Sequence, residues 1–483
     1  MKRLLLSMAL ALPLVAQQVA PPPPAAPREV KLPQPAEKTL ANGLRVIVVP
    51  KHDIPLVAAR LLVKAGAAAD PAERDGLAAL TATVLTQGTK TKSAEQIARG
   101  VEALGATLSA DAGWDFTSID LSVMSSNLPN AMTYVADVAR NATFAKNEFE
   151  RERAQAIDAL QLELTEPRPL AGIVMSRLIF GDAPYGHNSS GSLVSLGKLG
   201  RTDLVAFHAR HYRPDNAVLV LAGDIKADDA FALAQSAFGG WKSSGRRGAE
   251  STSSKTRRLG DLKPRVVVVD MPESGQSAVV VGRAGIRRAD PAYMNAIVAN
   301  SVLGAGYSSR LNQEVRIKRG LSYGAGSSFE PRLDVGPFIA RTETKHESAA
   351  EVAGLLVGEL NRLSQSDVPE AELTPRKAAL IGGFAQSLET TSGIVNRVSS
   401  LALYGLPLSD INRYISGVQA VTAEDVRKFA ASNLGGKDVN VLVIGDAKQF
   451  TEPLRAQFGE VEVISLEELD LASPTLRVRK AKK

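Results

Sequence analysis

The sequence contains no cysteine among its 483 residues. Disulfide bonds, a cysteine nucleophile and a lipid-modified cysteine behind a signal peptide are therefore excluded. Histidine is also scarce, with five residues, and aromatic residues make up only 5% of the chain. The Gly-x-Ser-x-Gly pattern that marks the serine nucleophile of an α/β-hydrolase is absent as well.

Excess positive charge is confined to the two ends of the chain. The formal net charge is +6, and removing the seven basic residues before position 4 and after position 476 leaves −1 for the body. These seven residues are Lys2, Arg3, Arg477, Arg479, Lys480, Lys482 and Lys483. A body without positive excess argues against a nucleic-acid-binding protein. The basic tail, residues 466–483, is predicted to be a solvated, disordered end.

Long apolar runs are missing except at the N-terminus. Lys2 and Arg3 precede an apolar stretch that is too short to span a bilayer, and small residues follow it. We interpret residues 1–16 as a signal peptide and expect a secreted or periplasmic protein with no integral membrane segment after its removal. Residues 17–36 are rich in proline and predict an extended, disordered leader.

The rest of the chain predicts an α+β protein. Asn42-Gly43 marks a hairpin over residues 38–49, and strands are predicted at 56–63, within 107–123 and at 216–223. Helices are predicted at 75–89, 93–104 (with Ser93 and Gln96 as a capping box), 130–141, 147–164, 167–180, 202–212 and 227–238.

Residues 242–262 are Ser, Thr, Gly, Lys and Arg with few apolar positions, which is typical of a linker. The pattern then restarts. Strands are predicted at 265–269, 277–282, 322–329, 336–344 and 440–445. Helices are predicted at 293–303, 308–318, 348–364, 369–389, 394–404, 408–418, 422–433 and 450–458.

One arrangement occurs on both sides of this linker. A helix with Thr202 as its N-cap leads to Asn-Ala-Val-Leu-Val-Leu-Ala-Gly-Asp, and a helix with Thr422 as its N-cap leads to Asn-Val-Leu-Val-Ile-Gly-Asp. The same order in both halves predicts two copies of one unit, residues 37–241 and 263–465. Strands grouped with helices, without strict β-α-β alternation, favour the α+β class.

The predicted helix at 75–89 has one face without functional side chains. Ala79, Ala82 and Thr83 lie at i, i+3 and i+4, the spacing with which a His-x-x-Glu-His helix directs two imidazoles and a carboxylate to one zinc ion. None of the three can bind zinc or abstract a proton.

An ordered set of short motifs resembles the pitrilysin/insulinase family of zinc peptidases and its non-catalytic members, over about residues 37–460. The motifs include Leu40-Ala41-Asn42-Gly43-Leu44, Asp75-Gly76-Leu77-Ala78, Gly88-Thr89, Pro184-Tyr185-Gly186, Gly191, Tyr212-Arg213-Pro214, Gly223-Asp224, Ser309-Arg310-Leu311 and Gly320-Leu321-Ser322-Tyr323. The resemblance implies two homologous domains, each a mainly antiparallel sheet packed with helices, that face each other across a chamber.

The resemblance implies that the family's zinc site is degenerate in this chain. The two zinc histidines and the catalytic glutamate fall on Ala79, Thr83 and Ala82, and the third zinc ligand falls on Ala159. We therefore expect no catalytic residue and no metal ligand in this chain. Asp158 and Glu163 are nearby, but a carboxylate without histidine ligands makes a poor zinc site.

The resemblance also implies a substrate-binding surface. Arg316 and Tyr323 keep the seven-residue spacing of a pair that contacts the substrate backbone in active family members. An arginine can bind a peptide carbonyl, and a tyrosine hydroxyl can donate to a developing oxyanion. The edge strand to which the family adds a substrate peptide maps to Ala110, Asp111 and Ala112. The alternative is a surface arginine, a packed tyrosine and an ordinary edge strand.

Two other patterns have simpler interpretations. His208 and His211 can share one helix face, but no nearby Asp, Glu or Cys completes a metal site, which favours packing or capping. The Gly304–Gly306 turn precedes a helix and could bind an anion, although a bare Gly-x-Gly is a weak signal.

These observations predict a non-catalytic, substrate-binding subunit of a heteromeric zinc peptidase. The partner would carry His-x-x-Glu-His and the zinc ion, and this chain would supply Arg316 and Tyr323 to the bound peptide. The alternative is a scaffold or peptide-binding protein of the same fold with no protease partner. A self-sufficient zinc peptidase would require tightly bound zinc and cleavage by the purified chain.

Overall fold

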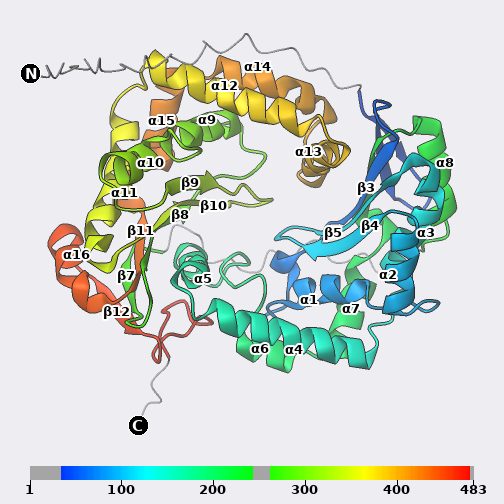
Figure 1. The fold of residues 1–483 in the computed structure, drawn as a ribbon, viewed down its shortest axis with the longest axis horizontal. Helices are drawn as coiled ribbons and strands as arrows, with labels where there is room; N and C mark the ends of the chain where they lie inside the picture. The colour runs from blue at the N-terminus through cyan, green and yellow to red at the C-terminus, as the bar shows by residue number, and fades with distance from the viewer. Residues whose placement is uncertain (1–33, 243–261, 479–483) are drawn as a thin grey trace, which may run out of the picture.

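The computed structural model describes residues 34–242 and 262–478. These residues form two six-stranded sheets with their helices, on opposite sides of the molecule in Figure 1. The α+β prediction is therefore confirmed. The predicted signal peptide, nearly all of the predicted leader and most of the predicted linker lie outside the described residues.

The predicted elements occur in their predicted order, and the structure adds the helix Leu193–Lys198 and the strand Glu462–Ser465. In the first half, they are β1 (Ala36–Thr39), β2 (Arg45–Pro50), β3 (Leu56–Val63), α1 (Leu77–Leu85), α2 (Ala94–Ala103), β4 (Thr107–Ala112), β5 (Thr117–Met124), α3 (Leu128–Asn141), α4 (Lys146–Glu163), α5 (Pro167–Phe180), α6 (Leu193–Lys198), α7 (Arg201–His211), β6 (Ala217–Gly223) and α8 (Ala227–Phe238). In the second half, they are β7 (Val266–Asp270), β8 (Ser277–Ala284), α9 (Tyr293–Leu303), α10 (Arg310–Asn312), β9 (Ala325–Phe329), β10 (Pro337–Thr344), α11 (Ala349–Gln365), α12 (Glu370–Ser387), α13 (Thr391–Leu403), α14 (Tyr414–Ala420), α15 (Ala423–Asn433), β11 (Asn440–Gly445), α16 (Thr451–Phe458) and β12 (Glu462–Ser465).

The two sheets have the same topology over five of their six strands. Their strand orders are β1-β2-β6-β3-β5-β4 and β12-β7-β11-β8-β10-β9. Both sheets contain an equivalent parallel pair, β2 with β6 and β7 with β11, followed by three antiparallel pairs. The sheets differ at one edge, where β1 pairs antiparallel to β2 but β12 pairs parallel to β7. The duplication predicted from the sequence is thus confirmed.

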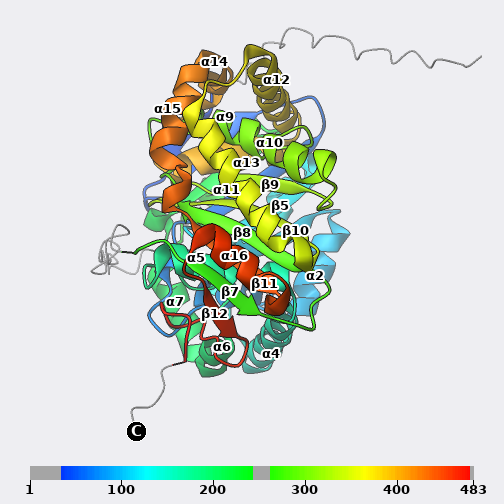
Figure 2. The same cartoon turned by 90° about the vertical axis from the view of Figure 1, so that its left-hand side faces the viewer.

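Both faces of each sheet are covered, which explains the continuous apolar runs of β6 and β11. Every residue of these two strands is buried. α3 and α8 pack on one face of the first sheet. α9, α11, α15 and α16 cover the outer face of the second sheet, where Figure 2 shows α11 and α16 toward the viewer. A strand buried on both faces has no polar side to alternate with.

The remaining face of each sheet is covered by a helix from the other half of the chain. α5 packs on the second sheet, where Val174 and Met175 contact the core that includes Val280 and Leu442. α13 packs on the first sheet, where Val398 contacts the core that includes Val220. The predicted division into 37–241 and 263–465 matches the two sheets. It does not predict that α5 and α13 each pack on the sheet of the other half, a contact that holds the two halves together.

A further contact between the halves is formed by Arg332, in the loop between β9 and β10. Its guanidinium lies 4.2 Å from the ring centroid of Trp114 and 4.7 Å from that of Tyr185. Next to it, the Tyr185 hydroxyl donates to Asp115 Oδ1 at 2.6 Å, and Leu333 N donates to Asp115 Oδ2 at 2.9 Å. A buried cation over aromatic faces fixes how the halves meet.

Several local predictions need correction. Thr202 is not an N-cap, because α7 begins at Arg201 and the Asp203 side chain accepts from Gly200 N instead. The helix predicted over 308–318 consists of the short α10 followed by a π-helical turn, Gln313–Lys318. The strand predicted from 322 begins at Ala325. The capping box at Ser93 and the N-cap at Thr422 are confirmed, and Thr422 also forms a capping box with Asp425.

The expectation of a solvated tail is wrong for residues 466–478. Leu476 is fully buried in the core that contains β7, and Arg265 donates to the carbonyls of Pro474 and Thr475. Arg477, one of the basic residues on which this expectation was based, donates to Val463 O and is therefore held against the fold. No helix within the described ranges is long and apolar enough to cross a bilayer.

Candidate functional site

α1 is the helix whose Ala79, Ala82 and Thr83 occupy the predicted zinc-site positions. Close contacts fix the backbone where this helix begins. Gly76 has φ of 88°, and a Cβ there would lie 2.8 Å from Gly191 Cα, so a larger residue would clash with the backbone of the loop at 191. Asp70 accepts from Gly76 N and Ala78 N, both at 2.8 Å. These bonds satisfy amide groups that the first turn of a helix leaves free.

The three sequence-predicted positions on α1 carry no metal-binding group. Ala79 is half-buried, Ala82 is buried and Thr83 is exposed. The Thr83 hydroxyl donates to its own helix, to Ala79 O at 3.1 Å. Ala159, on α4, is exposed, and α4 contacts α1. The structure therefore brings together the two helices that carry these positions.

Zinc does not fit the residues that are present. Zinc in proteins is held by Cys, His, Asp or Glu side chains, usually three or four of them. Among the described residues, no group of three His, Cys, Asp or Glu side chains lies close enough to hold a metal ion. Ala and Thr side chains at positions 79, 82, 83 and 159 supply no such donor.

The carboxyl of Asp70 and the imidazole of His187 are buried close together near the start of α1. The sequence does not reveal this pair. Asp70 has a fully buried side chain, and His187 Nε2 lies 3.8 Å from Asp70 Oδ2. Burial raises the pKa of Asp70 to about 8, and burial lowers the pKa of His187. Only the Pro184-Tyr185-Gly186 motif pointed to this loop, and nothing in the sequence pairs it with Asp70.

Asp70 gives a prediction for pH dependence. Its pKa is higher in the folded protein, about 8, than the ordinary 3.8, so the folded state holds the proton more tightly. This contribution to stability is complete below about pH 4 and is lost as pH rises toward about 8. The unfolding free energy of the native protein should therefore fall relative to that of Asp70→Asn, by up to about 1.4 kcal/mol per pH unit.

The measurement is denaturant unfolding of both proteins between pH 5 and pH 8.5. Asp158→Asn, which removes an exposed carboxyl on α4, serves as the control and should follow the native curve. Parallel curves for the native protein and Asp70→Asn would contradict the assignment, whether or not they are offset. A constant offset reflects only the hydrogen bonds that the amide cannot accept and does not depend on pH.

Arg316 and Tyr323 both lie on the surface, on either side of a helix end. Arg316 is on the π-helical turn, which ends as Leu321 N donates to Val315 O and Gly320 adopts φ of 64°. The Arg316 guanidinium lies 5.1 Å from the centroid of the Tyr307 ring. The Tyr323 side chain is 89% exposed. π-helical turns are rare and are frequent at functional sites.

A pocket of about 290 Å³ begins next to Tyr323. Its lining includes Gly324 and Ser327 on the second half and Arg168 on α5. Arg168 pairs with Glu343 of β10 at 3.5 Å, so α5 forms one wall of the pocket. α5 directly follows α4, the helix that carries Ala159, in the sequence.

The predicted edge strand is confirmed as an edge. β4 is the last strand of the first sheet and pairs only with β5 among the described strands, with Ala110 opposite Ile119 and Ala112 opposite Thr117. Asp111 is exposed, and Ala110 and Ala112 are half-buried. β4 also contacts α1. An unpaired strand edge can accept a peptide as an additional strand.

The two histidines of α7 have packing roles. His208 Nε2 lies 2.9 Å from Ala139 O, and its ring stacks on Tyr212 with a centroid separation of 4.5 Å. The His211 ring lies 4.5 Å from the ring of Phe207. Burial lowers the pKa of both imidazoles, that of His211 to about 4. The packing interpretation of these residues is confirmed.

Comparisons with family models and with curated proteins agree on one family. The model described as insulinase (peptidase family M16) matches residues 45–171, and the model described as peptidase M16 inactive domain matches residues 198–380. A protein of Mycobacterium tuberculosis named an uncharacterized zinc protease is 29% identical over 435 residues, which cover 88% of this chain and 97% of that protein. Another of that description from Bacillus subtilis is 24% identical over 393 residues, which cover 81% and 94%.

Solved structures show the same fold. The crystal structure of a peptidase M16 inactive domain from Pseudomonas fluorescens matches with a TM-score of 0.78 and 27% identity, covering 85% of this chain and 98% of that one. A protease from Helicobacter pylori matches with a TM-score of 0.82 and 19% identity, covering 86% and 100%. The second likeness concerns the fold alone.

Proposed function

This chain belongs to the pitrilysin/insulinase family of zinc peptidases, peptidase family M16, and from that premise we propose that it is the non-catalytic, substrate-binding subunit of a heteromeric peptidase. The partner is a family member that carries His-x-x-Glu-His and binds the zinc ion. This chain binds the peptide held in the partner's zinc site.

The observation that carries the proposal is an asymmetry between the two halves. On α1 and α4, Ala79, Ala82, Thr83 and Ala159 supply no ligand and no base. In the second half, Arg316 and Tyr323 remain exposed. A solvent-exposed tyrosine and arginine that add nothing to the core are available for a ligand, whereas buried ones would be occupied in packing.

The chemistry of this pair suits a substrate held elsewhere. The Arg316 guanidinium can hold a peptide carbonyl, and the Tyr323 hydroxyl can donate to the oxyanion that forms when the peptide bond is attacked. The β4 edge, with Ala110, Asp111 and Ala112, can align an extended peptide by strand addition. None of these contacts needs a metal ion in this chain, so the zinc-dependent step belongs to the partner.

We place the complex outside the cytoplasm, on the basis of the basic and apolar pattern of residues 1–16. The alternative is a structural scaffold or peptide-binding protein of the same fold with no protease partner, in which Arg316 and Tyr323 have no role in proteolysis.

Reconstitution tests the proposal. The purified chain is mixed with a family member from the same organism that carries His-x-x-Glu-His, and cleavage of internally quenched peptides is measured. We expect no cleavage by this chain alone and an increase of about tenfold or more when it is added to the partner. Equal cleavage rates of the partner with and without this chain would reject the subunit proposal and favour the scaffold or peptide-binding function. Cleavage and stoichiometric zinc in the chain alone would overturn both.

A further inference from the structure

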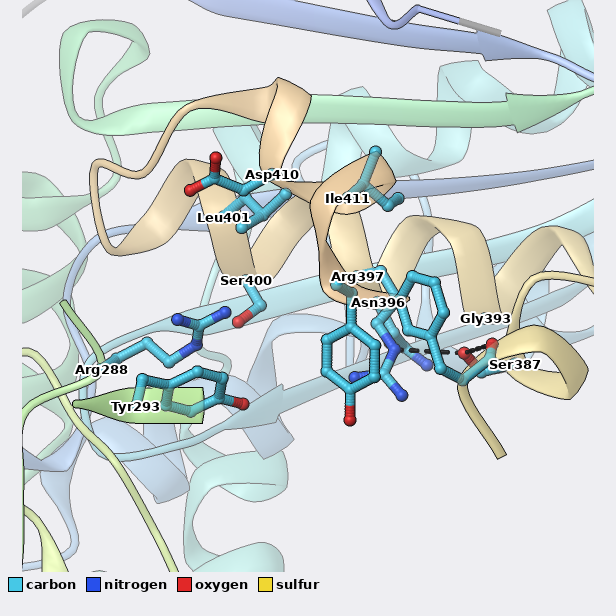
Figure 3. Close-up of a pocket in the computed structure, with 12 residues that line it drawn as sticks. Arg288, Tyr293, Ser387, Gly393, Asn396, Arg397, Ser400, Leu401, Asp410 and Ile411 are labelled. Atoms are coloured by element: carbon cyan, nitrogen blue, oxygen red, sulfur yellow. Dashed lines mark hydrogen bonds between the residues drawn. The ribbon is translucent and has the colours of Figure 1, made fainter. Parts of the chain in front are cut away.

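A second pocket lies away from the surface of Arg316 and Tyr323, where α12, α13 and α14 meet the segment before α9. Its volume is about 320 Å³. Figure 3 shows Arg288 and Tyr293 on one side of it and Asn396 and Arg397, from α13, on the other. The lining residues with polar groups are Arg288, Tyr293, Ser387, Asn396, Arg397, Ser400, Asp410 and Tyr414.

Two guanidinium groups in this pocket have no carboxylate partner. Within the described parts of the chain, neither Arg288 nor Arg397 forms an ion pair. The only carboxylate in the lining, Asp410, is paired with Arg413 at 3.4 Å. Both arginines are half-buried. Half-buried guanidinium groups without a carboxylate partner remain available to bind an anion.

Aromatic rings hold the two guanidinium groups. The Arg288 guanidinium lies 3.8 Å from the centroid of Tyr293. Arg397 lies 5.2 Å from the centroid of Phe384, which stacks on Tyr414 with the centroids 4.2 Å apart. Arg397 Nε also donates to Ser387 Oγ at 3.1 Å. Groups held in place lose less conformational freedom when a ligand binds.

The two guanidinium groups line the same pocket as Tyr414. The Arg397 guanidinium also lies 5.7 Å from the centroid of the Tyr414 ring. An anionic group bound in this pocket would therefore lie among two positive charges and the phenol ring of Tyr414.

We propose that this pocket binds a carboxylate, with Arg288 and Arg397 as its cationic contacts. A guanidinium matches the two oxygens of a carboxylate, and Asn396 and Ser400 can bond the rest of the ligand. The volume is at the lower end of small-ligand pockets, which suits one or two amino-acid residues. The source of the carboxylate is the C-terminus of a short peptide or a free organic acid. The inference does not depend on a partner peptidase.

Calorimetric titration of the full chain without any partner tests this. The probes are N-acetyl-Ala-Phe with a free carboxylate, the same dipeptide as its C-terminal amide, and succinate. We expect the free acid to bind about tenfold or more tightly than the amide, because a hydrogen bond to a charged group is lost in the amide. Binding of succinate but of neither dipeptide would assign the site to small organic acids.

Variants separate this site from general surface charge. Arg288→Gln and Arg397→Gln should each weaken binding of the tighter carboxylate by about tenfold or more. Arg287→Gln, next in the sequence, exposed and outside the pocket, should leave it unchanged. Thermal melting checks that each variant is folded. If the loss of the Ser387 contact unfolds Arg397→Gln, the test rests on Arg288→Gln alone. Equal binding of acid and amide, unchanged affinity in both variants, or no binding would overturn the proposal.

Discussion

Replacing Tyr323 with phenylalanine is expected to lower the kcat of the reconstituted peptidase by about 100-fold. This is the effect of removing one donor to a developing oxyanion. The side chain is 89% exposed in this chain alone, so the loss of its hydroxyl should not affect folding or assembly. A fall in kcat with little change in KM would place the hydroxyl at the transition state, because a group used equally in the ground state changes KM instead.

Arg316→Ala should lower kcat/KM by about 10- to 100-fold and should raise KM, because a positioned arginine binds the substrate carbonyl before the reaction. The chain offers matched controls for both changes. Tyr307→Phe removes the hydroxyl from the ring beneath Arg316, and Arg319→Ala removes another exposed arginine just beyond the same turn. Both controls should keep near-native rates. Unchanged kcat/KM in both Arg316→Ala and Tyr323→Phe would refute the subunit proposal.

The sequence predicted the features that depend on nearby residues. The capping box at Ser93 and the hairpin at Asn42-Gly43 were found because a cap or a turn is decided within a few residues. The duplication followed from the repeated helix and buried strand. The strand order did not, because β6 lies between β2 and β3, which are distant from it in the sequence. The sequence thus predicts that the chain has two similar units and that α1 lies in the first of them.

Contacts between distant segments could not be predicted in this way. Apolar spacing in α5 shows that Val174 and Met175 are buried, but it does not say that they pack on the sheet of the other half. The same is true of Val398 on α13. Arg332 was unremarkable in the sequence because its environment comes from Trp114 and Tyr185, in the other half of the chain.

The sites that the sequence missed have the same origin. Asp70 and His187 become a pair only when the loop before α1 meets the loop at 187. Arg288 and Arg397 line one pocket only because the fold brings α13 close to the segment before α9. Arg316 and Tyr323, in contrast, are identified by their resemblance to a known motif, and the structure shows that both are exposed.

Restoring the zinc ligands tests the assignment of the degenerate positions directly. The triple variant Ala79→His, Thr83→His and Ala159→Glu should bind one zinc ion per chain, measured by metal analysis after desalting. Ala82 is left unchanged because it is buried and a zinc site needs only the three ligands. With zinc at about 100 times its Kd, binding to the folded state alone should add about 2.7 kcal/mol to the unfolding free energy.

The third ligand is the discriminating part of this design, because two histidines on one helix bind zinc weakly in many proteins without any family resemblance. A variant with Ala79→His, Thr83→His and Leu162→Glu places the carboxylate three residues further along α4, at another exposed position. It should bind zinc no better than the two histidines alone. Zinc binding that requires Ala159→Glu would mean that α1 and α4 keep the spacing of a zinc site and lack only its ligands. Equal binding in the two triple variants would reject Ala159 as the equivalent position. The proposal for Arg316 and Tyr323 would survive that result, because Ala79, Ala82 and Thr83 would still supply no ligand and no base.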